Sequence, residues 1–175
     1  PVLYYWVAAS LYTVTGPNEF SARAGAAASG VGLALVTWAA ARRLWSTPRA
    51  AWLAGAIVAT SFGCFAMARM ALPDLPLAFF VTATIWAVLC ATADDTTASR
   101  SWWLIAGLAA GLGFLTKGPL AVVVPALVLA PLAWFDRRKR HVRLSDVALS
   151  AAVFLVVGLP WYVAMTATHG VAYLQ

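Results

Sequence analysis

Long apolar segments alternate with short polar ones along the whole chain. An α-helix needs about 20 apolar residues to cross the hydrocarbon core of a bilayer, and several segments reach that length. They do not alternate between apolar and polar residues, as the strands of a membrane barrel would. The pattern therefore predicts an all-α, polytopic transmembrane helix bundle. We place its spans at residues 19–44, 49–70, 74–92, 102–116, 119–135 and 146–166.

The first 15 residues form a shorter segment that is rich in Tyr and Trp. These side chains favour the membrane–water interface, so residues 1–15 are expected to form a juxtamembrane helix. Asn18 can cap the helix that follows, with Glu19 in its first turn. The chain starts with Pro and has no polar tail. We therefore expect residues 1–175 to be one transmembrane domain, an internal fragment of a larger membrane protein.

The composition excludes two other classes of protein. The chain is 63% hydrophobic and 10% charged, with a mean hydropathy of +0.83. A soluble domain is usually about one quarter charged. Disordered segments have low hydrophobicity. Neither a water-soluble globule nor a disordered segment fits these values.

The net charge of +6 is concentrated in the connectors near residues 45–48, 93–101 and 136–145. Alternating spans place all three connectors on one side, which the positive-inside rule assigns to the cytoplasm. Topology thus explains most of the basic residues, and no nucleic-acid partner is expected. The opposite side holds six ionisable residues: Glu19, Arg23, Arg69, Asp74, Lys117 and His169.

Ionisable residues at membrane depth are candidates for function, but each of these also has a structural explanation. Asp74, held between prolines, is either a carboxylate facing a headgroup-level cavity or a helix N-cap. Arg69 can neutralise Asp74 or bind a phosphate. Glu19 and Arg23 are spaced as an i, i+4 ion pair.

The segment Lys117-Gly118-Pro119 has two interpretations as well. Lys at a helix end, Gly in a left-handed conformation and Pro at the next helix start would make a tight hairpin. A lysine at the outer end of a helix can instead bind a phosphate. His169 is either structural or a ligand, and alone it cannot form a metal site.

Taken in order, the segments PVLYYW, NEFSAR, ARMALPD, FLTKGP and LPWY resemble the dolichyl-phosphate-mannose–protein mannosyltransferase superfamily. The nearest bacterial members are the aminoarabinose transferases of lipid A. The resemblance implies a GT-C glycosyltransferase whose active site lies on the non-cytoplasmic face. Such an enzyme moves a sugar, with inversion, from a polyprenyl-phosphate carrier to a lipid, protein or glycan acceptor. It also implies a multi-pass protein of the bacterial inner membrane, active on the periplasmic or extracellular side.

The resemblance assigns roles to individual residues. Asp74 matches the second outer carboxylate, an accessory catalytic group, and Lys117 matches the lysine of the Thr-Lys-Gly-Pro motif. The main catalytic acid is expected before Pro1. The expected substrate-binding residues are Lys117, Arg69, Glu19, Arg23 and His169. No cofactor is assigned, and a divalent cation is left open.

Two other functions are kept as alternatives, a transporter or flippase segment and a non-catalytic membrane subunit. A transporter favours broken helices and polar groups near the middle of the membrane. Here the ionisable residues gather at one end of the spans, which favours chemistry at the membrane surface. The 175-residue fragment alone is expected to be inactive.

Overall fold

The computed structural model describes residues 2–45, 47–93, 98–135 and 142–170. All regular secondary structure in these ranges is helical, which confirms the all-α prediction. The helices are α1 (Val2–Thr15), α2 (Glu19–Leu44), α3 (Pro48–Thr60), α4 (Phe62–Ala68), α5 (Asp74–Ala93), α6 (Ala98–Lys117), α7 (Leu120–Phe135), α8 (Leu144–Gly158) and α9 (Pro160–His169).

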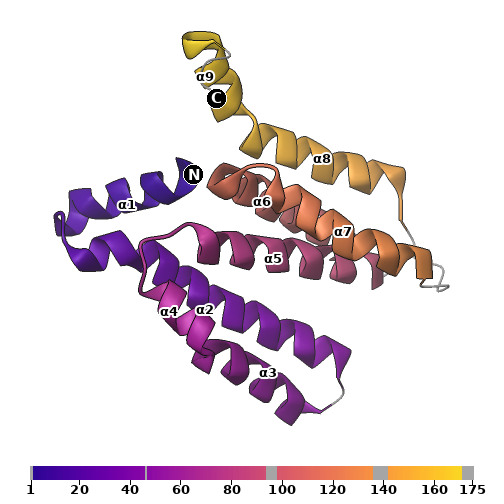
Figure 1. The fold of residues 1–175 in the computed structure, drawn as a ribbon. Helices are drawn as coiled ribbons and strands as arrows, with labels where there is room; N and C mark the ends of the chain where they lie inside the picture. Colours follow the sequence, from indigo (N-terminus) through magenta and orange to yellow (C-terminus); the bar gives the residue numbers. More distant parts are fainter. Residues whose placement is uncertain (1, 46, 94–97, 136–141, 171–175) are drawn as a thin grey trace.

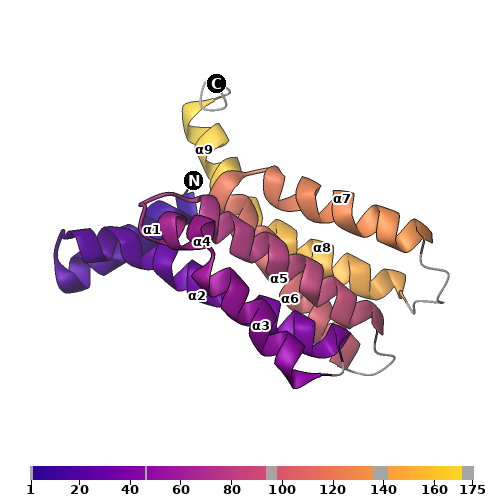
Figure 2. The same ribbon diagram turned by 60° about the horizontal axis from the view of Figure 1, so that its bottom comes forward.

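The longer helices pack side by side as a bundle (Figures 1 and 2). α5 packs against both α2 and α6, and α6 also packs against α8. α1 folds back along the start of α2, while α9 leaves the bundle at an angle (Figure 1). The starts of α2, α5 and α7 and the ends of α4 and α6 face one way, which we call the charged rim. The opposite end carries the connectors expected to be cytoplasmic; the basic run at 137–140 lies outside the described residues.

The second and sixth predicted spans are each broken into two helices. α3 and α4 are bent by 54° at Ser61, whose hydroxyl accepts a hydrogen bond from the Cys64 N–H at 3.3 Å and so caps α4. α8 and α9 are bent by 43° next to Pro160, which has no N–H to continue the helical ladder. The hydropathy pattern predicts both spans as continuous helices, and their interruption corrects that prediction.

The helices support a multi-pass membrane protein. Within the described residues, α2 and α5 are long and apolar enough to cross a membrane, and counting each bent pair as one crossing gives up to four candidates. α7 is apolar but shorter. The outward side chains of α3 and α7 include large exposed apolar groups such as Trp52, Ile57, Leu127 and Val128, which suit contact with lipid. The total of six spans remains a prediction.

Glycines bring α6 and α8 into close contact. A Cβ atom on Gly107 would lie 2.3 Å from the Ser150 carbonyl oxygen, and one on Gly111 would lie 2.9 Å from the Val157 Cβ. On α8, Gly158 lies opposite Gly111. The spacing of Gly107 and Gly111, four residues apart on α6, is therefore used for close helix packing.

Candidate functional site

The centre of the charged rim is an ion pair between Asp74 and Lys117. Asp74 is the first residue of α5 and Lys117 the last of α6, and these two helices pack antiparallel. The Lys117 Nζ donates to the Asp74 Oδ1 across 43 residues of sequence. Their side chains are 39% and 36% exposed, so a ligand at the rim can reach both groups.

Asp74 is not the N-cap of its helix. The Pro73 carbonyl oxygen accepts the first helical hydrogen bond, from the Leu77 N–H at 3.0 Å, so Pro73 occupies the capping position. The Asp74 carboxylate points instead to Lys117. The capping alternative is therefore wrong, and the side chain is available for chemistry at the rim.

The turn after Lys117 has the predicted geometry. Gly118 has a φ of +69°, and its N–H donates to the Phe114 carbonyl oxygen at 2.7 Å. The Pro119 carbonyl oxygen then accepts from the Val123 N–H at 3.0 Å, which starts α7. From α9, the Tyr162 hydroxyl also donates to the Phe114 carbonyl oxygen, at 3.2 Å. The structural interpretation is confirmed, and the same turn also holds Lys117 against Asp74.

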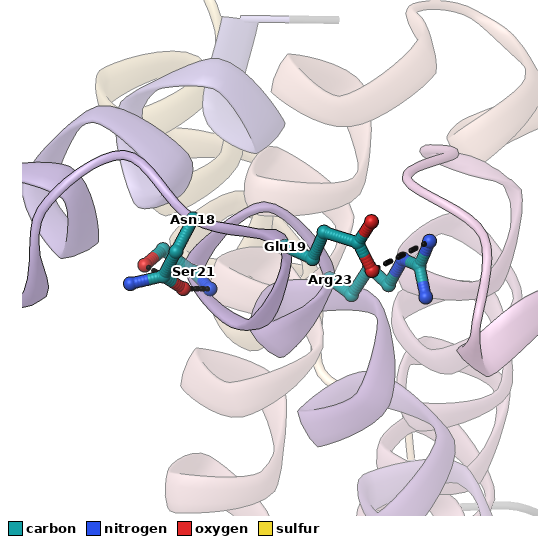
Figure 3. A network of polar contacts seen from close by, with 4 residues as sticks. All are labelled: Asn18, Glu19, Ser21 and Arg23. Carbon is teal, nitrogen blue, oxygen red and sulfur yellow. Dashed lines mark hydrogen bonds and ion pairs between the residues drawn. The ribbon is translucent and has the colours of Figure 1, made fainter.

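A second group of polar residues begins α2 (Figure 3). The Asn18 Oδ1 accepts from the Ser21 N–H at 2.9 Å, as predicted for the cap. On a different face of α2, the Arg23 and Glu19 side chains form an ion pair at 3.3 Å. In Figure 3 these two side chains point away from the cap, so their charges remain available on another face of α2.

Arg69 lies with this second group of polar residues and does not pair with Asp74. Glu19, Arg23 and Arg69 line the same cleft of about 300 Å³ between α2 and the end of α4. The Arg69 guanidinium lies 5.4 Å from the centre of the Phe65 ring. Of the two alternatives for Arg69, the neutralisation of Asp74 is not observed, because Lys117 makes that ion pair and Arg69 lines the cleft beside α2. The binding of a phosphate by Arg69 remains a prediction.

His169 lies at the end of α9 and is not brought to either group. Its Nδ1 is 2.7 Å from the Thr168 hydroxyl, and its side chain is exposed. No group of three His, Cys, Asp or Glu side chains suited to a metal forms in the described parts of the chain. The roles of His169 and of a divalent cation remain predictions.

A hollow of about 500 Å³, which the sequence did not lead us to predict, lies between α1, α2 and the segment before α5. Tyr4, Tyr5 and Tyr12 line it. The Tyr4 hydroxyl donates to the Ala22 carbonyl oxygen at 2.7 Å, and burial, followed by the nearby Tyr12 and Tyr5, raises its pKa above the usual value. The spacing of Tyr5 and Tyr12, two helical turns apart, was a signal for a shared face.

The fold and the rim define a class: a multi-pass helical membrane protein with reachable acidic and basic side chains gathered at one end of the bundle. Residues 1–170 match the model of the family described as dolichyl-phosphate-mannose-protein mannosyltransferase. The chain belongs to this family.

Two similar curated proteins are undecaprenyl phosphate-alpha-4-amino-4-deoxy-L-arabinose arabinosyl transferases. One, from Pseudomonas paraeruginosa, is 38% identical over 169 residues, covering 95% of this chain and 30% of that protein. Another, from Proteus mirabilis, is 30% identical over 171 residues, covering 94% of this chain and 30% of that protein. The chain thus spans about 30% of the length of the curated relatives it matches.

Crystal structures of ArnT from Cupriavidus metallidurans are similar to the chain at 27% identity. The apo structure matches with a TM-score of 0.85, covering 98% of this chain and 32% of that one. The structure bound to undecaprenyl phosphate matches with a TM-score of 0.78, covering 97% and 31%. The helix arrangement described above is therefore one that this family also shows in crystals.

Proposed function

We propose that the protein containing this chain is an integral-membrane GT-C glycosyltransferase. It transfers a sugar from a polyprenyl-phosphate carrier to a lipid-linked acceptor at the charged rim. The observation that carries the proposal is the reachable Asp74–Lys117 ion pair at the head of α5. The names of the relatives, which specify an undecaprenyl-phosphate-linked aminoarabinose, support this class of donor.

The chemistry needs one group for a proton and one for a leaving phosphate. The acceptor oxygen attacks the anomeric carbon of the sugar, the bond from that carbon to the carrier phosphate breaks, and the configuration inverts. A carboxylate can take the acceptor proton or orient the acceptor. A cation can stabilise the negative charge that develops on the departing phosphate. Asp74 and Lys117 are of the right type for these two tasks.

The ion pair suggests how donor binding prepares the site. Lys117 has three N–H donors, so it can contact a phosphate and Asp74 together, or exchange one for the other. A bound carrier phosphate would weaken the hold of Lys117 on Asp74. The Asp74 carboxylate would then be released toward the acceptor, beside the main acid that we place upstream of this chain.

We assign the protein to the bacterial inner membrane, with the charged rim on the periplasmic or extracellular side. The distribution of basic residues supports this orientation. His169 retains its proposed substrate-binding role on one condition. α9 would have to move so that His169 comes close to the charged rim.

The direct test is a transfer assay with the complete protein in proteoliposomes. The donor carries a radiolabelled sugar on undecaprenyl phosphate, and the acceptor is a phosphorylated glycolipid. We expect labelled glycolipid and free undecaprenyl phosphate in equal amounts. Movement of labelled donor across the bilayer without a glycosylated product would instead support a flippase. The absence of both transfer and donor movement would support a non-catalytic subunit.

Replacing Gly118 by Ala should lower both stability and transfer. A non-glycine residue in the left-handed conformation costs about 1–2 kcal/mol, and Gly118 has a φ of +69°. Relief of this strain would shift the turn and move Lys117 away from Asp74. The melting temperature and kcat/KM of the complete protein are to be measured together.

Gly16→Ala is the matched control for this variant. Gly16 has a φ of +77°, with open space around it and no contact with Lys117. Both variants should lose similar stability, and only Gly118→Ala should lose transfer. Full transfer by Gly118→Ala at a lowered melting temperature would show that the turn does not position Lys117.

A further inference from the structure

The cleft at the start of α2 carries charge that the Asp74–Lys117 pair does not explain. Two guanidinium groups, those of Arg23 and Arg69, face a single carboxylate, that of Glu19. The Arg69 guanidinium lies over the Phe65 ring. Among the described residues, no carboxylate forms an ion pair with it. The cleft therefore has an excess positive charge, on the side of the membrane where topology does not call for basic residues.

The shape of the cleft suits a small anionic group. Small side chains line it, those of Ala24, Ala27 and Ala68, which leaves room for a ligand beside the two arginines. The arginines come from different helices, one near the start of α2 and one at the end of α4. Guanidinium groups bind phosphate oxygens through paired N–H donors, and two arginines can hold one phosphate from two directions.

The surroundings of the cleft suit a lipid and not a soluble ion. Phe20, at 73% exposure, forms part of the cleft lining and is available to contact acyl chains. Arg23 is 45% exposed, so the site opens to the outside. α2 and α4 both belong to apolar segments long enough for a membrane crossing, and both reach the charged rim. A phosphate at this height is one attached to a membrane lipid.

We propose that Arg23 and Arg69 form a binding site for the phosphate of a lipid headgroup, separate from the Asp74–Lys117 pair. Resting on the proposed function, the inference identifies that lipid as the acceptor, a phosphorylated glycolipid. The Arg69 guanidinium, supported by Phe65, provides the fixed contact. Arg23 provides the second contact when it leaves Glu19.

Glu19 has a distinct place in this proposal. Its side chain is 84% exposed, and its carboxylate forms an ion pair with the Arg23 guanidinium. The Glu19 carboxylate therefore competes with a phosphate for Arg23, and its negative charge repels the phosphate. Removing the Glu19 charge should strengthen lipid binding, whereas a merely structural ion pair predicts no gain.

The test measures lipid retention by the complete protein in nanodiscs. The discs contain phosphatidylcholine with a small fraction of phosphatidic acid, whose phosphomonoester is the probe, and bound lipid is counted by native mass spectrometry. Arg69→Gln is expected to reduce retention of phosphatidic acid about tenfold or more, as lost charge-assisted hydrogen bonds imply. Arg23→Gln should act in the same direction, and Glu19→Gln should raise retention about two- to fivefold.

Arg42→Gln is the matched control. Arg42 lies at the other end of α2 and stacks 5.0 Å from the centre of the Trp38 ring, much as Arg69 stacks on Phe65. The Arg42→Gln variant removes the same charge and the same type of ring contact as Arg69→Gln. Its retention of phosphatidic acid should stay at the wild-type level. Equal retention in wild type and Arg69→Gln would overturn the site. Displacement of the lipid by an equal concentration of inorganic phosphate would overturn the lipid assignment.

The transfer assay separates this inference from the proposed function. Arg69→Gln should raise the KM for the glycolipid acceptor about tenfold or more, with kcat within about threefold of wild type. Active wild type with an unchanged acceptor KM in Arg69→Gln would contradict the acceptor site and leave the proposed function intact. Arginine-dependent lipid retention by a wild-type protein without transfer would support the lipid site and contradict the proposed function.

Discussion

Asp74→Asn in the complete protein is expected to lower kcat about 100- to 1,000-fold, within the range that a positioned acid–base side chain contributes. The amount of protein in the membrane should hardly change. The Asp74–Lys117 pair is more than one third exposed, and such pairs contribute less than about 1 kcal/mol to stability. Sugar transfer in proteoliposomes and protein abundance by immunoblot provide the two readouts.

The design of this experiment includes a partner and a control. If Asp74 and Lys117 act as a unit, Lys117→Gln and the double variant should each lose about as much activity as Asp74→Asn alone. The reason is that the effects of substitutions at residues that act together do not add. Asp146→Asn removes a carboxylate from the first turn of α8, at the opposite end of the bundle, and should transfer normally. Activity of Asp74→Asn close to wild type would exclude Asp74 from the reaction.

Among the 12 glycines of the chain, Gly107 is the one at which replacement by Ala is expected to be most damaging. The expected cost from overpacking is up to about 3 kcal/mol. The added Cβ would lie 2.3 Å from the Ser150 carbonyl oxygen, a backbone atom that cannot rotate away. Either α6 and α8 separate, or one helix shifts along the other. The expected readout is a melting temperature several degrees lower for the complete protein in detergent.

Gly63→Ala tests whether the effect comes from the helix crossing. Gly63 also lies within a helix, α4, but a Cβ atom added to it would have no atom of a neighbouring group within 4 Å. Alanine favours a helix over glycine by about 1 kcal/mol, so this variant should be neutral or slightly stabilising. A similar melting temperature for the two variants would mean that α6 and α8 can relax around the added methyl group.

Local signals allowed the sequence to predict much of the helical pattern. α2 spans Glu19–Leu44, as expected from the Asn18 cap and the Gly-Pro pair before it. The break at Ser61 was missed, since its capping hydroxyl lies in an otherwise apolar run and leaves the average hydropathy unchanged. Pro160 was a visible signal for the other break, since proline has no N–H for the helical ladder, but the apolar run around it was predicted as one span.

Topology explains which residues reach the rim, but not which of them meet. Alternating helices place Asp74, Lys117 and Arg69 at the same end, and this followed from counting crossings. Their partners depend on lateral packing, of α5 against α6 and of α4 against α2, which has no signature in a single sequence. For that reason the sequence left open whether its neighbour Arg69 pairs with Asp74, and the partner in space is Lys117.

The two helix breaks have a consequence for the thickness of the surrounding bilayer. α3 has 13 residues and α8 has 15, so at 1.5 Å per residue they extend about 20 Å and 22 Å from the connector end. The hydrocarbon layer is about 30 Å thick. Backbone groups freed at Ser61 and Pro160 need water or another partner at that depth. On these two flanks the straight helix falls about 8–10 Å short of that thickness, and α4 and α9 continue it only after bends of 54° and 43°. We expect the bilayer to thin there, which would let the polyprenyl chain of the proposed donor stay in lipid while its phosphate reaches the level of Lys117.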